Sequence, residues 1–487
     1  MKKIIGTLLC IILTVGCFAG CQRVSRDGIV EDEGALLKGI DFTADEEYEG
    51  ELKIMTTAEE SEADTINALV TAFQDKYPGI QVTIDNSTVM SGYYGKLTNN
   101  ASAAATSGDH SLVADVFWCA PDFTDTLYQA DMLMPLTLLD KKDDSIDTEA
   151  ELLSEALMVS KINNKLYLMP RDYNQVVMYY NQKMLEDVGM PLPTAQMTQT
   201  EFMGYLAELR AKINNSQATN EYGVKYSEAV KYLLDVNAGW DSWVWPLFKS
   251  FGSEVVDEEG KSVFDSDETL EALKFWQTVV DNGYACAVKD GGNVGVQFRM
   301  QQAPFLFHSR AWTTSLVKKT DQIKGVSKLG VTAVPQFGKN YAVGGGSSGY
   351  CMYKYSSHKT ESWLFLKFVA SEAGQNAFSN TGNCVPSRKS LLESDTAAWR
   401  TWTHERLGSG FDNNAFVYKL GEADSPFTST REFFQYVPFE AQSTVFTCLQ
   451  ATLQVIDTAK SEKDLTDKIT SQAQLIDYYV TKYQKKK

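Results

Sequence analysis

The sequence predicts an α/β fold, because segments that alternate like β-strands and segments with the period of amphipathic helices follow one another along the chain. The first ordered segments, residues 51–55, 63–76 and 80–84, read as a strand, a helix and a strand. This β-α-β order places two strands parallel in one sheet. With 487 residues, the chain is long enough for two or three structural units around a substantial core.

Each element of this first unit has a local reason. Residues 51–55 and 80–84 alternate in polarity, as half-buried strands do. The helix between them is indicated by apolar side chains at helical spacing, namely Ile66, Leu69, Val70 and Phe73. Residues 77–79, Tyr-Pro-Gly, end it because proline and glycine interrupt a helix.

The rest of the chain continues the alternation without an internal repeat. Strands are expected at 114–118, after the small-residue segment 101–109, and at 329–335 and 350–353. Helices are expected at 202–213, 270–280 and 362–368, and after Ser443. A second unit is therefore expected to begin near Asp172.

The charge argues against a nucleic-acid partner. Forty-five Lys and Arg face sixty-three Asp and Glu, which leaves a formal net charge of −18. Such a chain repels phosphate backbones, and no basic stripe offsets the repulsion. The hydrophobic content of 44% excludes a largely disordered chain.

The N-terminus has the order of a signal peptide over residues 1–20: two lysines, an apolar run and small residues. Residues 18–21, Phe-Ala-Gly-Cys, resemble the lipobox of bacterial lipoproteins, which implies cleavage before Cys21 and acylation of its thiol and new amine. Acyl chains would then hold the protein at the outer face of the cell membrane. The acidic stretch that follows, to residue 49, is interpreted as a solvated, flexible tether.

The remaining cysteines show no CxxC spacing: Cys119, Cys286, Cys351, Cys384 and Cys448. Five cysteines cannot all pair, so a disulfide framework is not expected, although one or two bridges stay open. Most of them are expected to be small buried apolar side chains.

Two catalytic patterns coincide in the glycine segment 344–349. Gly345, Ser347 and Gly349 match a serine-hydrolase elbow, and Gly344, Gly346 and Gly349 match a dinucleotide fingerprint. Both patterns need a helix afterwards, whereas residues 350–355 read as a strand. A close-packed backbone turn is therefore preferred over catalysis.

Metal and cofactor sites are not indicated. The four histidines, His110, His308, His358 and His404, lack the paired spacing of metal ligands. Acidic pairs such as Glu59-Glu60 could serve a glycosidase, but in an acidic protein most carboxylates are solvated.

A set of tryptophans is more informative. Trp118, Trp240, Trp243 and Trp312 lie at expected strand ends or turns. A sugar ring has an apolar face and a polar rim, so a sugar site needs flat rings for stacking and carboxylates or amides for hydrogen bonds. Together these residues favour an aromatic cleft.

The order of several short segments resembles the extracellular solute-binding proteins of ABC importers, especially the carbohydrate-binding group similar to maltose-binding protein. The segments that carry the resemblance lie at 52–54, at Phe73 with 77–82, at 114–118, 133–136 and 169–170, at 180–185 with Gly189, at 330–331 with 334–335, and at 382–387. It implies a two-lobed periplasmic-binding-protein-like fold of type II, with lobes joined by crossovers near 170, 344 and 386. The implied boundaries are 50–170 plus 344–388 for the first lobe and 171–343 plus 389–487 for the second.

The resemblance also implies ligand contacts, position by position. They are Glu59, Trp118, Asp122, Asn174, Trp240, Asp241, Trp243, Trp312 and Gly345. The family's usual Thr-Trp-Asp-Glu-Phe is replaced here by Thr-Gln-Thr-Glu-Phe at 198–202, and Ser309 stands where a glycine is usual.

The resulting hypothesis is a monomeric, lipid-anchored protein that captures a carbohydrate, an oligosaccharide, and delivers it to an ABC permease without catalysis or a cofactor. Three alternatives stay open: a binding protein for a non-sugar solute such as a peptide or modified polyol, an exported glycoside-processing enzyme, and a surface adhesin.

Overall fold

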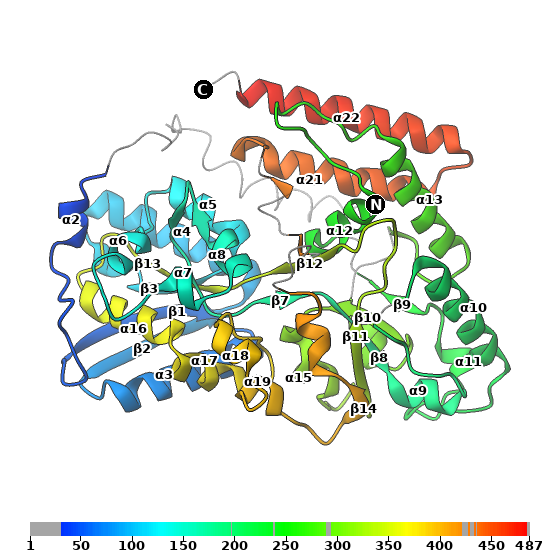
Figure 1. Ribbon diagram of the computed structural model, residues 1–487, viewed down its shortest axis with the longest axis horizontal. Coiled ribbons are helices and arrows are strands. Elements are labelled where there is room, and N and C mark those ends of the chain that lie inside the picture. The colour runs from blue at the N-terminus through cyan, green and yellow to red at the C-terminus, as the bar shows by residue number, and fades with distance from the viewer. Residues whose placement is uncertain are drawn as a thin grey trace, which may run out of the picture.

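A computed structural model of the chain describes residues 31–195, 197–236, 239–288, 294–420, 427–428, 433–434 and 436–484. It has two α/β lobes side by side, each built on a five-stranded sheet (Figure 1). The predicted signal peptide and Cys21 lie outside the described residues. No helix within the described ranges has both the length and the apolar composition needed to cross a bilayer.

The first sheet has the strand order β2-β1-β3-β13-β6. Its strands are β1 (Gly50–Thr57), β2 (Ile80–Thr88), β3 (Val116–Cys119), β6 (Met169–Pro170) and β13 (Gly349–Met352). β1 runs parallel to β2 and β3, which confirms the predicted β-α-β unit, whereas β13 enters antiparallel to β3. The chain therefore leaves this sheet after β6 and returns to it at β13, almost 180 residues later.

Helices cover both faces of this sheet and bury one apolar cluster against it. They are α2 (Glu33–Leu37), α3 (Glu60–Lys76), α4 (Met90–Ser107), α5 (Pro121–Gln129), α6 (Leu136–Asp140), α7 (Thr148–Glu151), α8 (Ser154–Ser160), α16 (Lys359–Ala370) and α17 (Glu372–Ser379). The short helix η1 (His110–Leu112) precedes β3. The small-residue segment 101–109, for which no element was expected, is mostly the end of α4.

The second sheet has the order β14-β11-β8-β10-β9. Its strands are β8 (Val177–Asn181), β9 (Leu234–Asp235), β10 (Phe305–His308), β11 (Leu329–Ala333) and β14 (Leu407–Phe411). β8 is central and antiparallel to both β10 and β11. Two apolar clusters lie on this sheet and its helices.

The described helices of the second lobe are α9 (Gln182–Asp187), α10 (Gln199–Asn215), α11 (Tyr226–Ala229), α12 (Asp241–Phe251), α13 (Asp267–Asp281), α14 (Val296–Arg299), α15 (Thr313–Val317), α18 (Lys389–Glu393), α19 (Ala398–Thr401), α21 (Phe439–Gln454) and α22 (Glu462–Gln484). The two long C-terminal helices, α21 and α22, pack together at the top of the lobe (Figure 1). Among the described residues of this lobe, 3-10 turns occur at η3 (Arg310–Trp312) between β10 and α15, at η4 (Asn413–Val417) after β14, and at η5 (Val455–Asp457) between α21 and α22.

Between the lobes lies a small three-stranded sheet, β15-β12-β7, made of β7 (Asn174–Gln175), β12 (Val343–Gly346) and β15 (Phe427–Thr428). β7 follows β6 of the first sheet and leads into β8 of the second, and β12 leads back into β13. The hairpin β4 (Lys161–Ile162) and β5 (Lys165–Leu166) extends from the first lobe. The chain thus crosses between lobes near residues 172 and 347, and again after α17.

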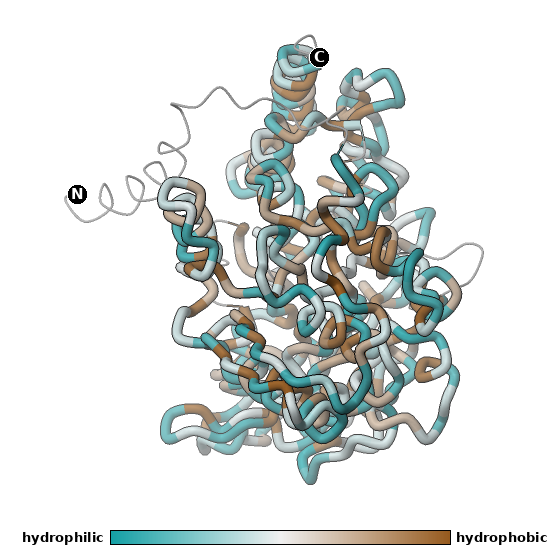
Figure 2. Tube along the Cα trace, turned by 90° about the vertical axis from the view of Figure 1, so that its left-hand side faces the viewer, coloured by the Kyte–Doolittle hydropathy of each residue, from teal (hydrophilic) through white to brown (hydrophobic). Residues whose placement is uncertain are grey.

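The structure corrects the expected tether. Residues 31–49 pack on the first lobe: Leu36 is buried, and Lys354 pairs with Glu31 at 2.7 Å. The backbone amide of Asp41 donates to Thr360 Oγ1. These contacts order the segment because Lys359 and Thr360 at the start of α16 bind its backbone, and because Leu36 joins the apolar cluster of the first lobe. Along the described chain as a whole, hydrophilic and hydrophobic stretches alternate (Figure 2).

Four of the cysteines, Cys119, Cys351, Cys384 and Cys448, are buried thiols outside any disulfide, and Cys286 is half-buried. The expectation of buried apolar side chains is confirmed for these four. Burial raises the pKa of the Cys384 thiol, which keeps it protonated.

Candidate functional site

A cavity of about 430 Å³ lies between the lobes, where the small sheet joins them. Its walls come from five separate parts of the chain. The first lobe contributes Ala120, Pro121, Asp122, Asp125, Gln129, Val159, Ile162 and Asn163. The second lobe contributes Trp240, Asp241, Ser242, Phe434, Val437, Phe439 and Gln442, and the crossover contributes Gly345, Gly346 and Ser347. A solute in this cavity touches both lobes.

On the first lobe, the start of α5 presents the acidic side chains. β3 ends at Cys119, and Pro121 begins the helix, a position where proline costs no hydrogen bond. Asp122 therefore lies in the first turn and Asp125 one turn later on the same face. The N-terminus of a helix favours a carboxylate, so the backbone amides at the start of α5 partly offset the cost of burying the charge of Asp122.

A two-residue hairpin turn contributes an amide to the same wall. Asn163 and Asn164 join β4 to β5 with φ angles of 49° and 61°. Two successive positive φ angles define a type I′ turn, for which asparagine is one of the few suitable residues. The turn places Asn163 at the cavity.

On the second lobe, Trp240 precedes α12 and Asp241 begins it. The Asp241 carboxylate accepts the backbone amide of Ser242 at 2.7 Å. Gly344 lies against this helix start: a Cβ there would be 1.8 Å from the Ser242 carbonyl oxygen. Only glycine allows β12 to approach α12 so closely, and this contact fixes the wall that carries Trp240 and Asp241.

Asp122 and Asp241 face the cavity from opposite lobes. Desolvation in the cleft and, secondarily, the charge of Asp241 raise the pKa of Asp122 from 3.8 to about 6. The protonated form of Asp122 is therefore favoured in this arrangement near pH 5, whereas two like charges face each other near pH 8.

The raised pKa predicts that the protein without solute becomes more open as the pH rises. In the arrangement seen here, the pKa of Asp122 is higher than in an open form that exposes the carboxyl group to water. The closed arrangement therefore loses stability relative to the open form as the pH rises from about 4 to about 6, and the loss is complete above about 6. Small-angle X-ray scattering between pH 5 and pH 8 should show a larger radius of gyration at pH 8. Asp122→Asn should flatten the profile; an equal pH response in that variant would contradict the assignment.

Four of the nine predicted contact residues line the cavity: Asp122, Trp240, Asp241 and Gly345. Asn174 does not line the cavity itself, but it pairs with the lining residue Gly346 between β7 and β12. Its Oδ1 is buried without a hydrogen-bond partner in the described ranges. Trp312 also stands behind the wall, separated from Trp240 by the ring of His308. Ligand contact at each of these positions stays a prediction.

The structure places two predicted tryptophans in cores instead. Trp243 is 3% exposed and packs between Trp276, Phe307 and Phe337. Trp118 is 8% exposed and lies against Tyr93 and Tyr94. Both indoles are thus almost fully buried among neighbouring rings.

Glu59 likewise lies outside the cavity wall. It precedes α3, and its Oε1 accepts the backbone amide of Met90 at the start of α4. The carboxylate therefore joins the N-terminal ends of two helices of the first lobe. Its second oxygen is buried without a partner among the described residues.

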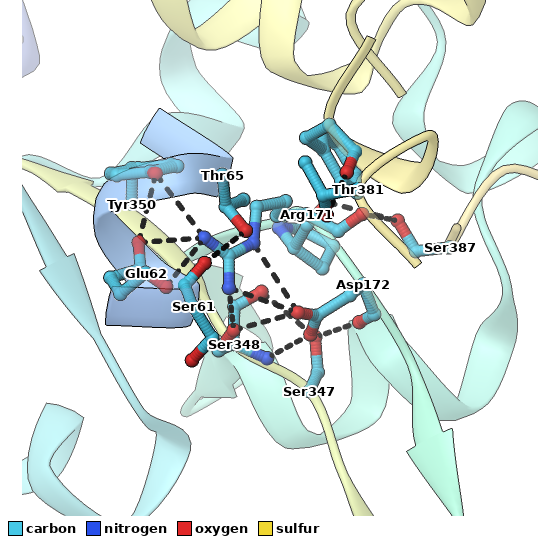
Figure 3. Close-up of polar contacts among 12 residues, drawn as sticks. Ser61, Glu62, Thr65, Arg171, Asp172, Ser347, Ser348, Tyr350, Thr381 and Ser387 are labelled. Atoms are coloured by element: carbon cyan, nitrogen blue, oxygen red, sulfur yellow. Dashed lines mark hydrogen bonds and ion pairs between the residues drawn. The ribbon is translucent and has the colours of Figure 1, made fainter. Parts of the chain in front are cut away.

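The two crossovers nearest the cavity are held by a buried polar cluster, the crossover network, drawn in Figure 3. At its centre, Arg171 Nη1 donates to both oxygens of Glu62, at 2.8 and 3.0 Å. Its Nη2 donates to Asp172 Oδ2 at 3.1 Å and to Ser348 Oγ at 2.8 Å. Burial raises the pKa of Glu62 even beside Arg171.

Other members of the crossover network tie the backbones together. Asp172 Oδ1 accepts the Ser348 amide at 2.7 Å, and Ser347 Oγ donates to the Asp172 carbonyl at 2.6 Å. Ser387 Oγ donates to the Pro170 carbonyl at 2.9 Å, so the third crossover joins the same point. All three crossovers thus start from one fixed position on the first lobe.

The glycine segment has no catalytic geometry. Ser347 is followed by strand β13, as predicted, so no helix N-terminus faces its hydroxyl. That hydroxyl is already engaged with the Asp172 carbonyl. The segment serves as wall and crossover, and within the described ranges no group of His, Cys, Asp and Glu could hold a metal ion.

Sequence reasoning missed most of the remaining wall. Phe434, Phe439 and Gln442 come from the entry to α21, almost two hundred residues after Trp240. The aromatic density of 433–439 was a signal for the first two. The Asn-Asn pair between two short alternating segments was a signal for Asn163.

Comparison with known proteins gives the same fold. The GacH receptor of Streptomyces glaucescens, whose structures include a complex with acarbose, aligns with a TM-score of 0.66 at 18% identity over 89% of this chain and 99% of its own. UgpB from Mycobacterium tuberculosis, in complex with glycerophosphocholine, aligns with a TM-score of 0.67 at 17% identity over 90% and 100%. The sugar-binding protein MalE from Xanthomonas citri aligns at 0.65 and 16% over 89% and 98%. These likenesses confirm the predicted two-lobed α/β fold.

At the sequence level, a putative binding protein of Brucella abortus (strain 2308) is 25% identical over 253 residues, which is 49% of this chain and 55% of that protein. The chain thus spans about half the length of the curated relatives it matches. The family model described as bacterial extracellular solute-binding protein matches residues 68–405, which is well over half of the chain. The chain therefore belongs to the bacterial extracellular solute-binding protein family.

Proposed function

We propose that the protein captures a carbohydrate, an oligosaccharide, in the cavity between its lobes and delivers it to the permease of an ABC importer. The observation that carries this proposal is the composition of the cavity wall, which combines aromatic rings with carboxylates and amides from both lobes. Contact with both lobes makes binding favour the closed arrangement, because only that arrangement satisfies both walls.

The chemistry of the wall suits a sugar. Trp240, Phe434 and Phe439 offer flat apolar surfaces for the C–H face of a pyranose. Asp122, Asp125 and Asp241 accept hydrogen bonds from hydroxyl groups, and amides such as Gln129 both donate and accept. A volume of about 430 Å³ falls in the usual range of small-molecule sites.

Support also comes from the solved neighbours, several of which bind saccharides by their own descriptions: acarbose for GacH, and cycloalternan for an ABC substrate-binding protein from Listeria monocytogenes. UgpB was solved with glycerophosphocholine, which keeps a non-sugar solute as the second candidate. Calorimetry against a panel of oligosaccharides and glycerophosphodiesters separates the two. Chromatography of the saccharides after incubation tests the proposal that no bond is cleaved.

Replacing Trp240 by alanine should weaken binding of the cognate saccharide about tenfold, because one stacked ring and its buried area are lost. Isothermal titration calorimetry measures the change. Trp402→Ala is the matched control: this half-buried tryptophan packs on Gly382, away from the cavity. Equal affinities for Trp240→Ala and the unmodified protein would contradict the proposed site.

The proposal extends to the surroundings of the protein. Acylation at Cys21 would hold a monomer at the outer face of the cell membrane, where the cavity meets solutes before they reach the permease. Lobe boundaries at 50–170 plus 344–388 and at 171–343 plus 389–487 are proposed on the same basis. The crossover network would then hold the three connections at the first lobe while the second lobe moves.

A further inference from the structure

Three flat side chains form a column that leads away from the cavity. The ring of His308 lies between two indoles: its centroid is 4.7 Å from that of Trp240, at an angle of 22°, and 4.3 Å from that of Trp312, at 29°. Both pairs are nearly parallel, so His308 uses both faces of its ring. Of the three residues, only Trp240 lines the cavity.

The far end of the column rests on backbone. A Cβ on Gly295 would be 2.2 Å from the six-membered ring of Trp312, so the indole lies directly against the glycine. Gly295 has a φ of 79°, and its amide donates to Asp235 Oδ2 at 2.9 Å. The same oxygen accepts the amide of Phe298 at 3.1 Å. Trp312 therefore lies against a backbone segment that is held by the Asp235 carboxylate.

His308 is itself held in one orientation. It ends β10, where it pairs with Val177 of the central strand β8. The backbone amide of Ser309 donates to His308 Nδ1 at 2.9 Å, so that nitrogen carries no proton and the ring is the Nε2–H tautomer. Burial lowers the pKa of His308 to about 3, which keeps the ring neutral. A neutral planar ring can stack between two indoles without a desolvated charge.

Trp240 lies at the cavity end of the column, and its side chain also packs against the apolar core cluster of the second lobe. It is a single residue before α12, and it is only half-buried. One face of its indole lies on His308, and the side chain also lines the cavity. A platform that is already held still loses less side-chain entropy when a solute stacks on it.

We propose that His308, supported by Trp312, is a positioning residue that holds the indole of Trp240 in place as the stacking platform of the cavity. This inference rests on the proposed function only where it takes the solute to be a saccharide. The column of rings itself is given by the observed contacts. It gives Trp312 a supporting role in place of direct contact with the solute.

The first test needs no solute. The protein is labelled with 5-fluorotryptophan, and the ¹⁹F signal of Trp240 is assigned by its absence from Trp240→Phe. We expect Trp240 to give one sharp signal in the unmodified protein and in His308→Phe, which keeps a flat ring. His308→Leu, which keeps volume without a flat ring, should broaden or split that signal, while the Trp402 signal stays unchanged. A Trp240 signal in His308→Leu as sharp as in the unmodified protein would overturn the proposal.

The second test measures affinity for maltotetraose by calorimetry. His308→Leu is expected to bind about tenfold more weakly and His308→Phe within about threefold of the unmodified protein, since stacking is restored. If His308→Phe binds as weakly as His308→Leu while its Trp240 signal is unchanged, His308 acts through its N–H group and the proposal is wrong. If the unmodified protein does not bind maltotetraose, the proposed function fails for that saccharide, and the ¹⁹F comparison decides the positioning role alone.

Discussion

Replacing Arg171 by methionine should lower the free energy of unfolding by about 3–5 kcal/mol, the cost of breaking a buried ion pair by removing one partner. The Arg171 side chain is 4% exposed, and its partners Glu62 and Asp172 are 10% and 2% exposed. Methionine fills much of the space but leaves both carboxylates without their cation. Urea denaturation followed by circular dichroism measures the loss.

The matched control is Lys96→Met. Lys96 pairs with Asp85 at 2.6 Å, as short a contact as that between Arg171 and Glu62, but the two side chains are 33% and 42% exposed. An exposed pair contributes only about 0–1 kcal/mol. The double variant with Arg171→Met and Glu62→Gln should recover part of the loss, because one stranded charge is removed. Equal losses for Arg171→Met and Lys96→Met would show that the crossover network does not stabilise the fold.

Replacing Gly344 by alanine should cost about 1–3 kcal/mol of stability and also weaken solute binding, because the added methyl group cannot be accommodated without a backbone shift. The new Cβ would be 1.8 Å from the Ser242 carbonyl oxygen, so β12 or the start of α12 must move. That start carries Trp240 and Asp241, and a displaced wall no longer meets the solute correctly. Denaturation and calorimetry on the same variant measure both effects.

Gly346→Ala is the control for this prediction. Gly346 lies two residues further along β12, and a Cβ there would have no atom within 4 Å. The substitution should therefore leave the free energy of unfolding close to that of the unmodified protein. A loss as large as that of Gly344→Ala would mean that glycine is required throughout the strand and not specifically at the contact with α12.

The predicted elements that the structure confirms are those with a strong local period. The strand at 51–55 is part of β1, the helix at 63–76 is part of α3, and the strand at 80–84 is part of β2. Such elements depend on which side chains alternate within a few residues, and that information is contained in the segment itself. The tether predicted for this region is wrong over residues 31–49 for the opposite reason, since that segment is ordered by contacts with Thr360 in α16 and with Lys354 after β13.

Local sequence patterns predicted only part of the candidate site. Trp240, Asp241 and Trp243 are close in sequence, yet the first two line the cavity and the third is in the core. A helix turns about 100° per residue, so residues 241 and 243 point about 200° apart. The start of α12 therefore decides which side chain meets the cavity, and residue type alone could not locate that start.

By itself, the sequence determined the α/β class, the order of the first parallel unit, the strand after the glycine segment and the resemblance to the solute-binding family, because each depends on local periodicity or on the order of short segments. Only the tertiary structure decided which side chains form the cavity wall, how Arg171 joins the crossovers, and that His308 separates Trp312 from Trp240. These features depend on contacts between residues tens to hundreds of positions apart. Such contacts form only when the packed lobes bring those residues together.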